Sequence, residues 1–171
     1  MYNDIPKHIF RFITLILLQV YVLNNFLFLN IINPYVYIYF ILLLPFNIPN
    51  FLSTILGFSI GIAIDYFTGS LAINAIATTF LGFLRPFILK LFAPFDGYEP
   101  NTKPTIEYYG LSWWLSYSSL ATFIHHTILF FSETFNFHNI FFTFGKIILS
   151  SFFTILLMTL FQYLFNKTKS Q

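Results

Sequence analysis

Residues 51–67 read FLSTILGFSIGIAIDYF, an apolar run whose only charged residue is Asp65. A run of this length is near the ~17–25 residues that a helix needs to cross a bilayer. Similar runs fill the chain from Ile9 to Phe165, and charged residues are 8% of the composition against 57% hydrophobic. No stretch between Ile9 and Phe165 is polar enough to form the surface of a water-soluble domain. The sequence therefore predicts an integral membrane protein.

The length and patterning of the apolar runs predict the fold class. Lipid offers no hydrogen bonds, so a chain crosses it as helices or as a closed barrel. The runs are too long, and alternate too little, for barrel strands. We expect an all-α bundle of about six transmembrane helices, forming one membrane domain over residues 1–171. That length leaves no room for a separate soluble domain.

Prolines, glycines and polar residues divide the chain into spans. The second span is short and proline-bounded, so it could be thinned, tilted or re-entrant. The third and fourth, joined by Thr68-Gly69-Ser70, should form an antiparallel hairpin. The only long polar connection is predicted at about 94–110. The six expected spans are 9–29, 35–46, 51–67, 71–92, 111–131 and 140–165.

The basic residues predict the orientation. Six spans would place both termini on one side, together with all basic residues except Lys146. Cytoplasmic segments of membrane proteins are enriched in Lys and Arg, so both termini and the 94–110 loop are predicted to be cytoplasmic. If the second span is re-entrant, the two ends cannot share a side. The basic residues assigned to the inner side are Lys7, Arg11, Arg85, Lys90, Lys103, Lys167 and Lys169.

The composition also excludes several classes of function. The chain has no Cys, so disulfides, thiol catalysis and cysteine metal sites are ruled out. The net charge of +2 is small and the basic residues are dispersed, so no nucleic-acid partner is expected. The first apolar run is longer than a signal-peptide core and lacks a small-residue cleavage site, so it is expected to be retained.

Small residues recur every four positions in the third span, at Gly57, Gly61 and Gly69, with Asp65 in the same series. This spacing places them along one helix face, where glycines allow a second helix to approach closely. We expect a helix-packing seam, within the protein or against a partner. An ionisable group inside a bilayer needs a partner or a proton, so Asp65 is expected to be a structural anchor more than a catalytic group.

Other polar residues of the spans fall at a similar depth, in the outer layer. Asp65 could pair there with Lys146 or with one histidine, His125 or His126, and Gln19 and Asn74 could extend the cluster. The alternative is that Lys146 reaches to the outer interface and makes no pair. Toward the inner side, Arg85 is expected to reach the interface in the same way.

No catalytic or metal-binding motif is evident. Adjacent helical residues point about 100° apart, so His125 and His126 cannot easily share a metal, and His138 with Glu133 adds no recognised spacing. No phosphate-binding glycine loop, nucleophile elbow or carboxylate pair occurs. We therefore expect no enzyme activity, cofactor or metal. Trp113 and Trp114 follow the polar loop, where aromatic residues anchor helices at the interface.

Strings along almost the whole chain resemble the rod shape-determining protein MreD family, in its bacteroidete-like form. The most specific are the glycine-rich GFSIGIAIDYFTGS at 57–70 and DGYEP at 96–100. Their order and spacing carry the resemblance more than any one string. The others are LLQVYVLNN (17–25), INPYVYIYFILLLPF (32–46), FLRPFILKLFAPF (83–95), GLSWWL (110–115) and IHHTILFF (124–131).

The resemblance implies a non-enzymatic subunit of the bacterial inner membrane. Members of this family work beside MreC and link cytoplasmic MreB filaments to RodA and a class B penicillin-binding transpeptidase in peptidoglycan synthesis. Their fold is similar to that of the six-helix substrate-binding subunits of energy-coupling-factor vitamin transporters. It further implies binding of MreC through intramembrane and periplasmic faces, with Gly57 and Gly61 as a candidate contact.

Two other functions stay open at this point. A substrate-binding subunit of a vitamin transporter would carry small residues on its first helix for docking, but residues 15–29 contain neither Ala nor Gly. A membrane enzyme such as a prenyl-chain phosphatase would need Arg, His and Asp facing one cavity. A lipid or other ligand between the helices is compatible with any of these functions.

Overall fold

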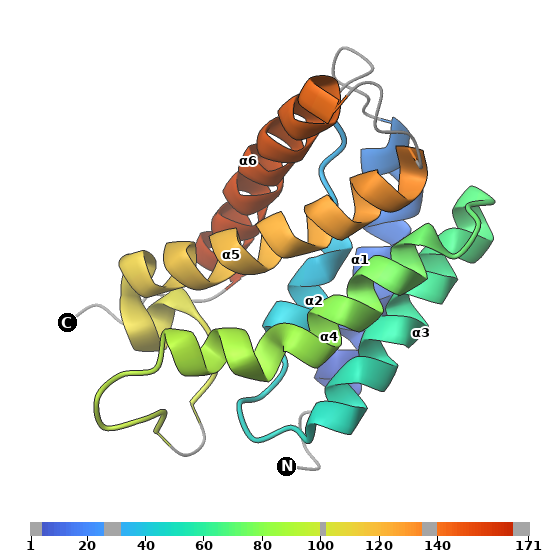
Figure 1. Ribbon diagram of the computed structural model, residues 1–171. Helices are drawn as coiled ribbons and strands as arrows, with labels where there is room; N and C mark the ends of the chain where they lie inside the picture. Colours follow the sequence, from blue (N-terminus) through green and yellow to red (C-terminus); the bar gives the residue numbers. More distant parts are fainter. Residues whose placement is uncertain (1–4, 26–31, 100–101, 135–139, 166–171) are drawn as a thin grey trace.

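The computed structural model describes residues 5–25, 32–99, 102–134 and 140–165, and it is helical in architecture. Five of its helices have 17 or more residues (Figure 1). Between the first and second of these, the described residues form only short helical turns: the 3-10 turns η2 (Leu23–Asn25) and η3 (Val36–Ile38) and the one-turn α2 (Tyr39–Leu42). The long helices are α1 (Ile5–Tyr21), α3 (Asn50–Thr68), α4 (Ile73–Leu91), α5 (Ile106–Thr134) and α6 (Ile140–Phe165).

Four helical stretches in the described residues are long and apolar enough to cross a membrane: Ile5–Asn25, Asn50–Thr68, Ile73–Leu91 and Ile140–Phe165. α5 is long enough to cross a membrane, but its serines and its two adjacent histidines make it more polar than these four stretches. The predicted all-helical class is confirmed, whereas the residues that the structure describes contain four long apolar spans and not six. The expected span 35–46 is a short buried segment, and part of the expected first span, 26–29, lies outside the described residues.

Successive segments nevertheless alternate in direction. In Figure 1, α1 rises, residues 32–46 descend through the middle, α3 rises, α4 descends, α5 rises and α6 descends. The central segment thus carries the chain from one end of the bundle to the other without being a full-length helix.

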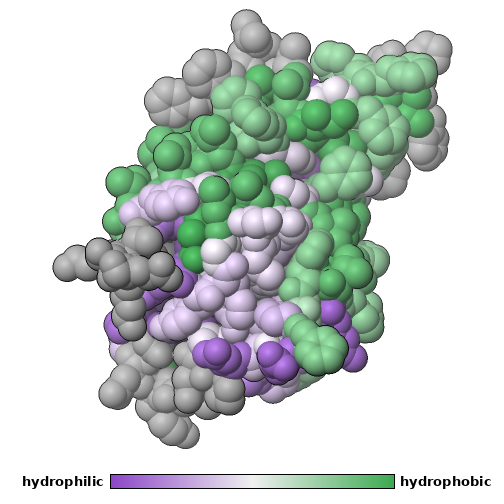
Figure 2. Space-filling model, turned by 90° about the vertical axis from the view of Figure 1, so that its left-hand side faces the viewer, coloured by the Kyte–Doolittle hydropathy of each residue, from purple (hydrophilic) through white to green (hydrophobic). Residues whose placement is uncertain are grey.

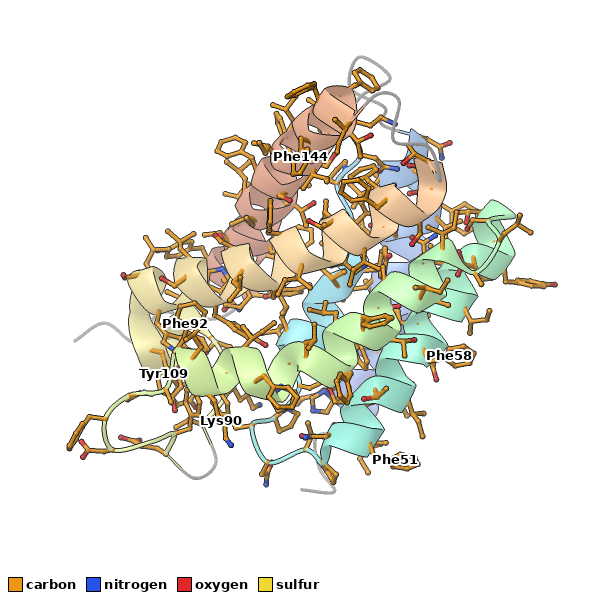
Figure 3. All side chains as sticks on the ribbon, in the orientation of Figure 1. Phe51, Phe58, Lys90, Phe92, Tyr109 and Phe144 are labelled. Carbon is orange, nitrogen blue, oxygen red and sulfur yellow. The ribbon has the colours of Figure 1, made fainter. Side chains whose placement is uncertain are left out.

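The outer surfaces of the long helices are apolar. Phe51 and Phe58 lie on the outer side of α3 (Figure 3), with 74% and 52% of their surface exposed. The face seen in Figure 2 is hydrophobic over its upper part and hydrophilic near its lower edge, at the height of the loop between α4 and α5. Large exposed side chains of this kind are stable where lipid covers them. These features are those of a multi-pass membrane protein.

The helices α3 and α4 form the antiparallel hairpin that the sequence predicts. A Cβ built on Gly61 would lie 2.5 Å from the Ala75 Cα, and one on Gly57 would lie 3.1 Å from the Thr78 carbonyl carbon. Gly82 of α4 meets the Ser53 carbonyl in the same way. The glycines therefore bring two backbones of the same chain together. The close approach at Gly57 and Gly61 is made within the chain, and α4 occupies the face that the resemblance assigned to a partner.

Gly69 has a different role from the two seam glycines. Its φ of 68° ends α3 in the left-handed conformation, and a Cβ there would meet nothing within 4 Å. Glycine adopts this conformation without the penalty that other residues incur. Gly69 therefore allows the sharp turn into α4.

The loop between α4 and α5 is held by aromatic contacts. The Tyr98 ring stacks on Phe46 at 4.1 Å, and its hydroxyl donates to the Leu89 carbonyl at 2.6 Å. Burial raises the pKa of Tyr98 to about 12, so this hydroxyl keeps its proton. The Trp113 indole donates to the Phe92 carbonyl at 2.9 Å. α5 begins at Ile106 with a short turn, but its continuous part starts after Gly110, which is the predicted end of the loop.

Trp114 is not an interfacial anchor as expected. Its side chain is fully buried, and its indole nitrogen donates to Thr159 of α6 at 3.1 Å. Gly110, with φ 80° and ψ 167°, kinks the start of α5, and the helix that follows carries Trp114 on its inner face. The tryptophan thus fastens α5 to α6.

The hairpin seam gives a direct stability test. Gly61→Ala should lower the free energy of unfolding by about 1–3 kcal/mol, the usual cost of overpacking, because its methyl meets backbone atoms that cannot move aside. Gly145→Ala in α6 is the matched control, since a Cβ there meets nothing within 4 Å. Thermal unfolding in detergent measures both. An equal effect of the two substitutions would contradict the seam.

Candidate functional site

The central segment, residues 32–46, contains the longest continuous buried run among the described residues, Val36 to Leu44. Val36, Tyr37, Ile38, Ile41 and Leu42 have no exposed surface. Much of the segment is not α-helical, so its backbone groups lack the partners that a helix would supply. Away from water, each unpaired group would cost several kcal/mol. Side chains of the surrounding helices take the place of those partners.

At the upper end, one glutamine satisfies two of these groups. The Gln19 Oε1 accepts from the Val36 N–H at 2.9 Å, and its Nε2 donates to the Pro34 carbonyl at 3.0 Å. From α6, Thr154 accepts from the Tyr35 N–H at 3.0 Å and Ser150 accepts from the Asn33 N–H at 3.3 Å. Helices α1 and α6 are therefore both tied to the segment.

At the lower end, an arginine and a tyrosine bind its carbonyls. Arg85 of α4 donates through Nη2 to the Leu44 carbonyl and through Nη1 to the Pro45 carbonyl at 3.4 Å. Tyr117 of α5 donates to the Leu42 carbonyl at 3.2 Å. A cation is favourable beside the carbonyl end of a helical turn. Arg85 is 2% exposed, so the expectation that it reaches to the interface is wrong.

Asp65 caps the start of α4. Its Oδ1 accepts from the Asn74 backbone N–H at 3.1 Å, and its Oδ2 accepts from the Ala75 N–H at 2.8 Å. Ser70 donates to the same carboxylate at 2.5 Å. The residue at the N-cap position of α4, Ala72, has no side chain that could do this. A carboxylate at a helix N-terminus is stabilised by the free N–H groups and by the helix dipole.

From Asp65 a chain of hydrogen bonds crosses the bundle. The Asn74 Nδ2 donates to Asp65 Oδ1 at 2.9 Å, and the Tyr37 hydroxyl donates to Asn74 Oδ1 at 2.8 Å. The Tyr37 oxygen lies 3.2 Å from His125 Nε2, and the Nδ1 atoms of His125 and His126 lie 3.4 Å apart. His126 Nε2 lies 3.2 Å from the Thr154 hydroxyl. We call this set, Asp65-Asn74-Tyr37-His125-His126-Thr154, the polar chain.

The predicted outer cluster is thus distributed over three places. Asp65, Asn74 and both histidines share the polar chain, while Gln19 holds the central segment separately. Lys146 makes no ion pair with Asp65 in the described part of the chain. Its ammonium lies 5.6 Å from the Phe130 ring centre and 5.8 Å from that of Phe142. Attraction between a cation and an aromatic face accounts for this position.

The polar groups show no arrangement suited to metal binding. Within the described residues no group of three or more His, Cys, Asp or Glu side chains could hold a metal ion. The predicted neighbour His138 lies outside those residues. The ring nitrogens of His125 and His126 lie within hydrogen-bonding distance of each other and of the Tyr37 and Thr154 hydroxyls.

Several residues that bind the central segment, contact Asp65 or belong to the polar chain were not identified from the sequence. Tyr37, Tyr117, Ser70, Ser150 and Thr154 are common in membrane helices, and nothing in their spacing marks them. The available signal was the run Asn33-Pro34 to Pro45 itself, because a proline-bounded segment too short to span leaves backbone groups unpaired. Those groups require polar residues on the neighbouring helices.

Comparisons with protein-family models, with curated proteins and with solved structures each give no match.

Removing the upper tie should destabilise the fold. Gln19→Leu keeps the approximate volume but leaves the Val36 N–H and the Pro34 carbonyl without partners, at a cost of about 1–3 kcal/mol each. Leu17→Ala, at a half-exposed position of the same helix, should cost clearly less. Denaturant or thermal unfolding of the purified protein measures the difference. Similar losses for both would show that Gln19 is not a tie.

A charge swap tests the separation of Asp65 from Lys146. Asp65→Lys should be strongly destabilising, because it places an ammonium against the N–H groups of α4. Adding Lys146→Asp should not restore stability, and the coupling energy should stay within about 0.5 kcal/mol, as for sites without contact. A double-mutant cycle on folded yield and unfolding temperature measures it. Rescue by the second substitution would establish an ion pair.

Proposed function

We propose that the protein is a non-enzymatic subunit of the bacterial inner membrane that binds MreC. In this role it helps to couple MreB filaments to RodA and a class B penicillin-binding transpeptidase, and so maintains cell shape. The observation that carries the proposal is the order and spacing of the MreD-like strings along nearly the whole chain. We propose no cofactor and no nucleic-acid partner.

The way the polar groups are used favours binding over catalysis. Asp65, Arg85, His125 and His126 are buried and lie against groups of the protein itself. Catalytic groups need a place where a substrate can meet them. The surfaces available for action are the apolar outer faces of the long helices, which suit the transmembrane helix of a partner and the surrounding lipid.

Charge supports an orientation with the α4–α5 loop and both termini in the cytoplasm. Lys90 lies in the last turn of α4 and Lys103 in the loop itself, whereas Lys146 lies near the start of α6, toward the opposite end of the bundle. Positive residues are enriched on the cytoplasmic side. The exposed Asp96 and Glu99 make the loop a polar surface that filaments or their adaptors could contact.

The transporter-subunit alternative is less well supported. α1 (IPKHIFRFITLILLQVY) contains no Ala or Gly, so it lacks the small residues expected for docking a coupling subunit. Any small ligand retained by the purified protein would nevertheless favour that function, so the same experiment should look for one.

Co-purification from the host's own gene pair tests the proposal. The tagged chain and the host's MreC are co-expressed, extracted in mild detergent and separated by size. We expect MreC to elute with the chain in a fixed ratio. The matched variants are Gly145→Ala, which should retain MreC, and Gly61→Leu, which should lose it together with the fold.

Two results would count against this function. Absence of MreC with a folded wild-type chain would remove the proposed partner. Absence of MreC together with a tightly retained small molecule, identified by mass spectrometry, would favour the transporter subunit. Cell rounding on depletion is a weaker test, because general envelope damage also rounds cells.

A further inference from the structure

The turn that follows α4 displays apolar side chains outside the helices. Ala93, Pro94 and Phe95 are three consecutive exposed residues, and the side chain of Phe95 is completely exposed. Among the described residues, Phe95 is the only exposed phenylalanine that does not lie on a long helix. Lipid covers the phenylalanines of the long helices, so their exposure has an explanation that does not extend to Phe95.

The protein fixes the position of this turn. The Gly97 N–H donates to the Pro94 carbonyl at 2.9 Å, which closes a β-turn with Phe95 at its second position. The residues on its two sides are tied to the helices. Before the turn, the Phe92 carbonyl accepts from an indole N–H of α5, and after it Tyr98 donates to a carbonyl of α4. We call residues 93–97 the Phe95 turn.

The loop beyond the turn is held as well. The Tyr109 hydroxyl accepts from the Glu99 N–H at 3.3 Å and lies 2.6 Å from the Thr102 hydroxyl. A loop that is already ordered loses less conformational freedom when it binds another molecule. Phe95 is therefore presented to a partner on a preorganised support, as the buried aromatic residues at the centres of protein interfaces are.

The charges beside Phe95 indicate what kind of partner fits. Asp96 follows it directly, Glu99 comes three residues later, and both are exposed. The cytoplasmic leaflet is rich in anionic lipids, which repel carboxylates. The face seen in Figure 2 is also hydrophilic near its lower edge, at the height of this loop. A membrane surface is thus a poor occupant, whereas a protein surface with basic residues is a complementary one.

We propose that the Phe95 turn docks into an apolar pocket of a cytoplasmic protein, with Lys or Arg side chains at the rim of that pocket meeting Asp96 and Glu99. Phe95 is the anchor that the pocket buries, and the two carboxylates orient the encounter. The inference rests on the proposed function for the cytoplasmic orientation of the loop, and it assigns to that loop the chemistry of its partner.

A labelling experiment separates the orientation from the docking. The chain has no Cys, so Asp96→Cys introduces a single thiol. A membrane-impermeant maleimide is added to intact spheroplasts and to opened cells. We expect labelling only after the cells are opened. Labelling of intact spheroplasts would contradict the orientation, and with it the proposed function as well as the docking.

Photocrosslinking in the host tests the docking itself. The full chain carries p-benzoylphenylalanine in place of Phe95, and the matched control carries it in place of Phe87, which is 56% exposed on α4. We expect a discrete protein adduct from position 95 and not from position 87. Mass spectrometry of the adduct should place the cross-link among apolar residues with Lys or Arg beside them. That location, and not capture alone, supports the proposal.

Removing the two carboxylates tests the charged rim. Asp96→Asn with Glu99→Gln should lower the yield of the position 95 adduct by about threefold to tenfold, because exposed ion pairs each contribute little. Glu133→Gln is the matched control, since it removes an exposed carboxylate at the far end of α5. It should leave the yield unchanged.

Phe95→Ala measures the anchor, with the captured protein in purified form. The affinity should fall by about tenfold or more. The unfolding temperature and the co-purification of MreC should not change, because the Phe95 side chain is completely exposed. Three results would overturn the proposal: no protein adduct at position 95, whether or not lipid adducts form; an adduct yield that the two neutral substitutions leave unchanged; or equal affinity of Phe95→Ala and the wild type.

Discussion

The rest of the structure depends on the need to pair the backbone of residues 32–46 without water. A full helix would meet this need internally, but Pro34 and Pro45 bound a segment too short for one. The missing partners come from side chains on α1, α4, α5 and α6. Non-helical backbone is tolerated at membrane depth only when protein surrounds it. The central segment is therefore the element around which the long helices are arranged.

This constraint explains where the polar residues lie. A glutamine, an arginine and a buried tyrosine would each be unfavourable facing lipid, yet each is placed where a backbone group needs it. Asp65 follows the same logic at the start of α4, where Ala72 cannot cap the helix. With these groups turned inward, the outer faces of α3 and α6 are left apolar.

The sequence predicted the parts that depend on local composition. Long apolar runs gave the helical class, and Thr68-Gly69-Ser70 gave the hairpin, because chain direction must reverse there. The prediction failed where one sequence pattern is compatible with two different structures. The spacing of Gly57 and Gly61 predicts close helix packing, but it does not tell whether the facing helix is α4 or a partner. In the same way, the position of Trp114 after the loop does not tell whether its side chain is buried against α6 or lies at the membrane interface. The position of each polar residue along its span predicted which residues lie at a similar depth. It did not predict that the Lys146 ammonium would lie over a phenylalanine ring and not beside Asp65.

The two ends of the central segment differ in what holds them. At the lower end, Arg85 and Tyr117 donate to carbonyls, and stacked rings of Phe46 and Tyr98 cover the exit of the chain. At the upper end, the partners are neutral amides and hydroxyls, and the same Thr154 that accepts from Tyr35 also faces His126. A charged, aromatic-covered end is costly to open, because opening it would expose an arginine without partners. The upper end holds no charged group, so opening it leaves only neutral groups unpaired, at about 1–3 kcal/mol each. If the bundle changes shape when a partner binds, the movement should therefore be at the upper end, where α6 meets the central segment, with the Arg85 end as its fixed base.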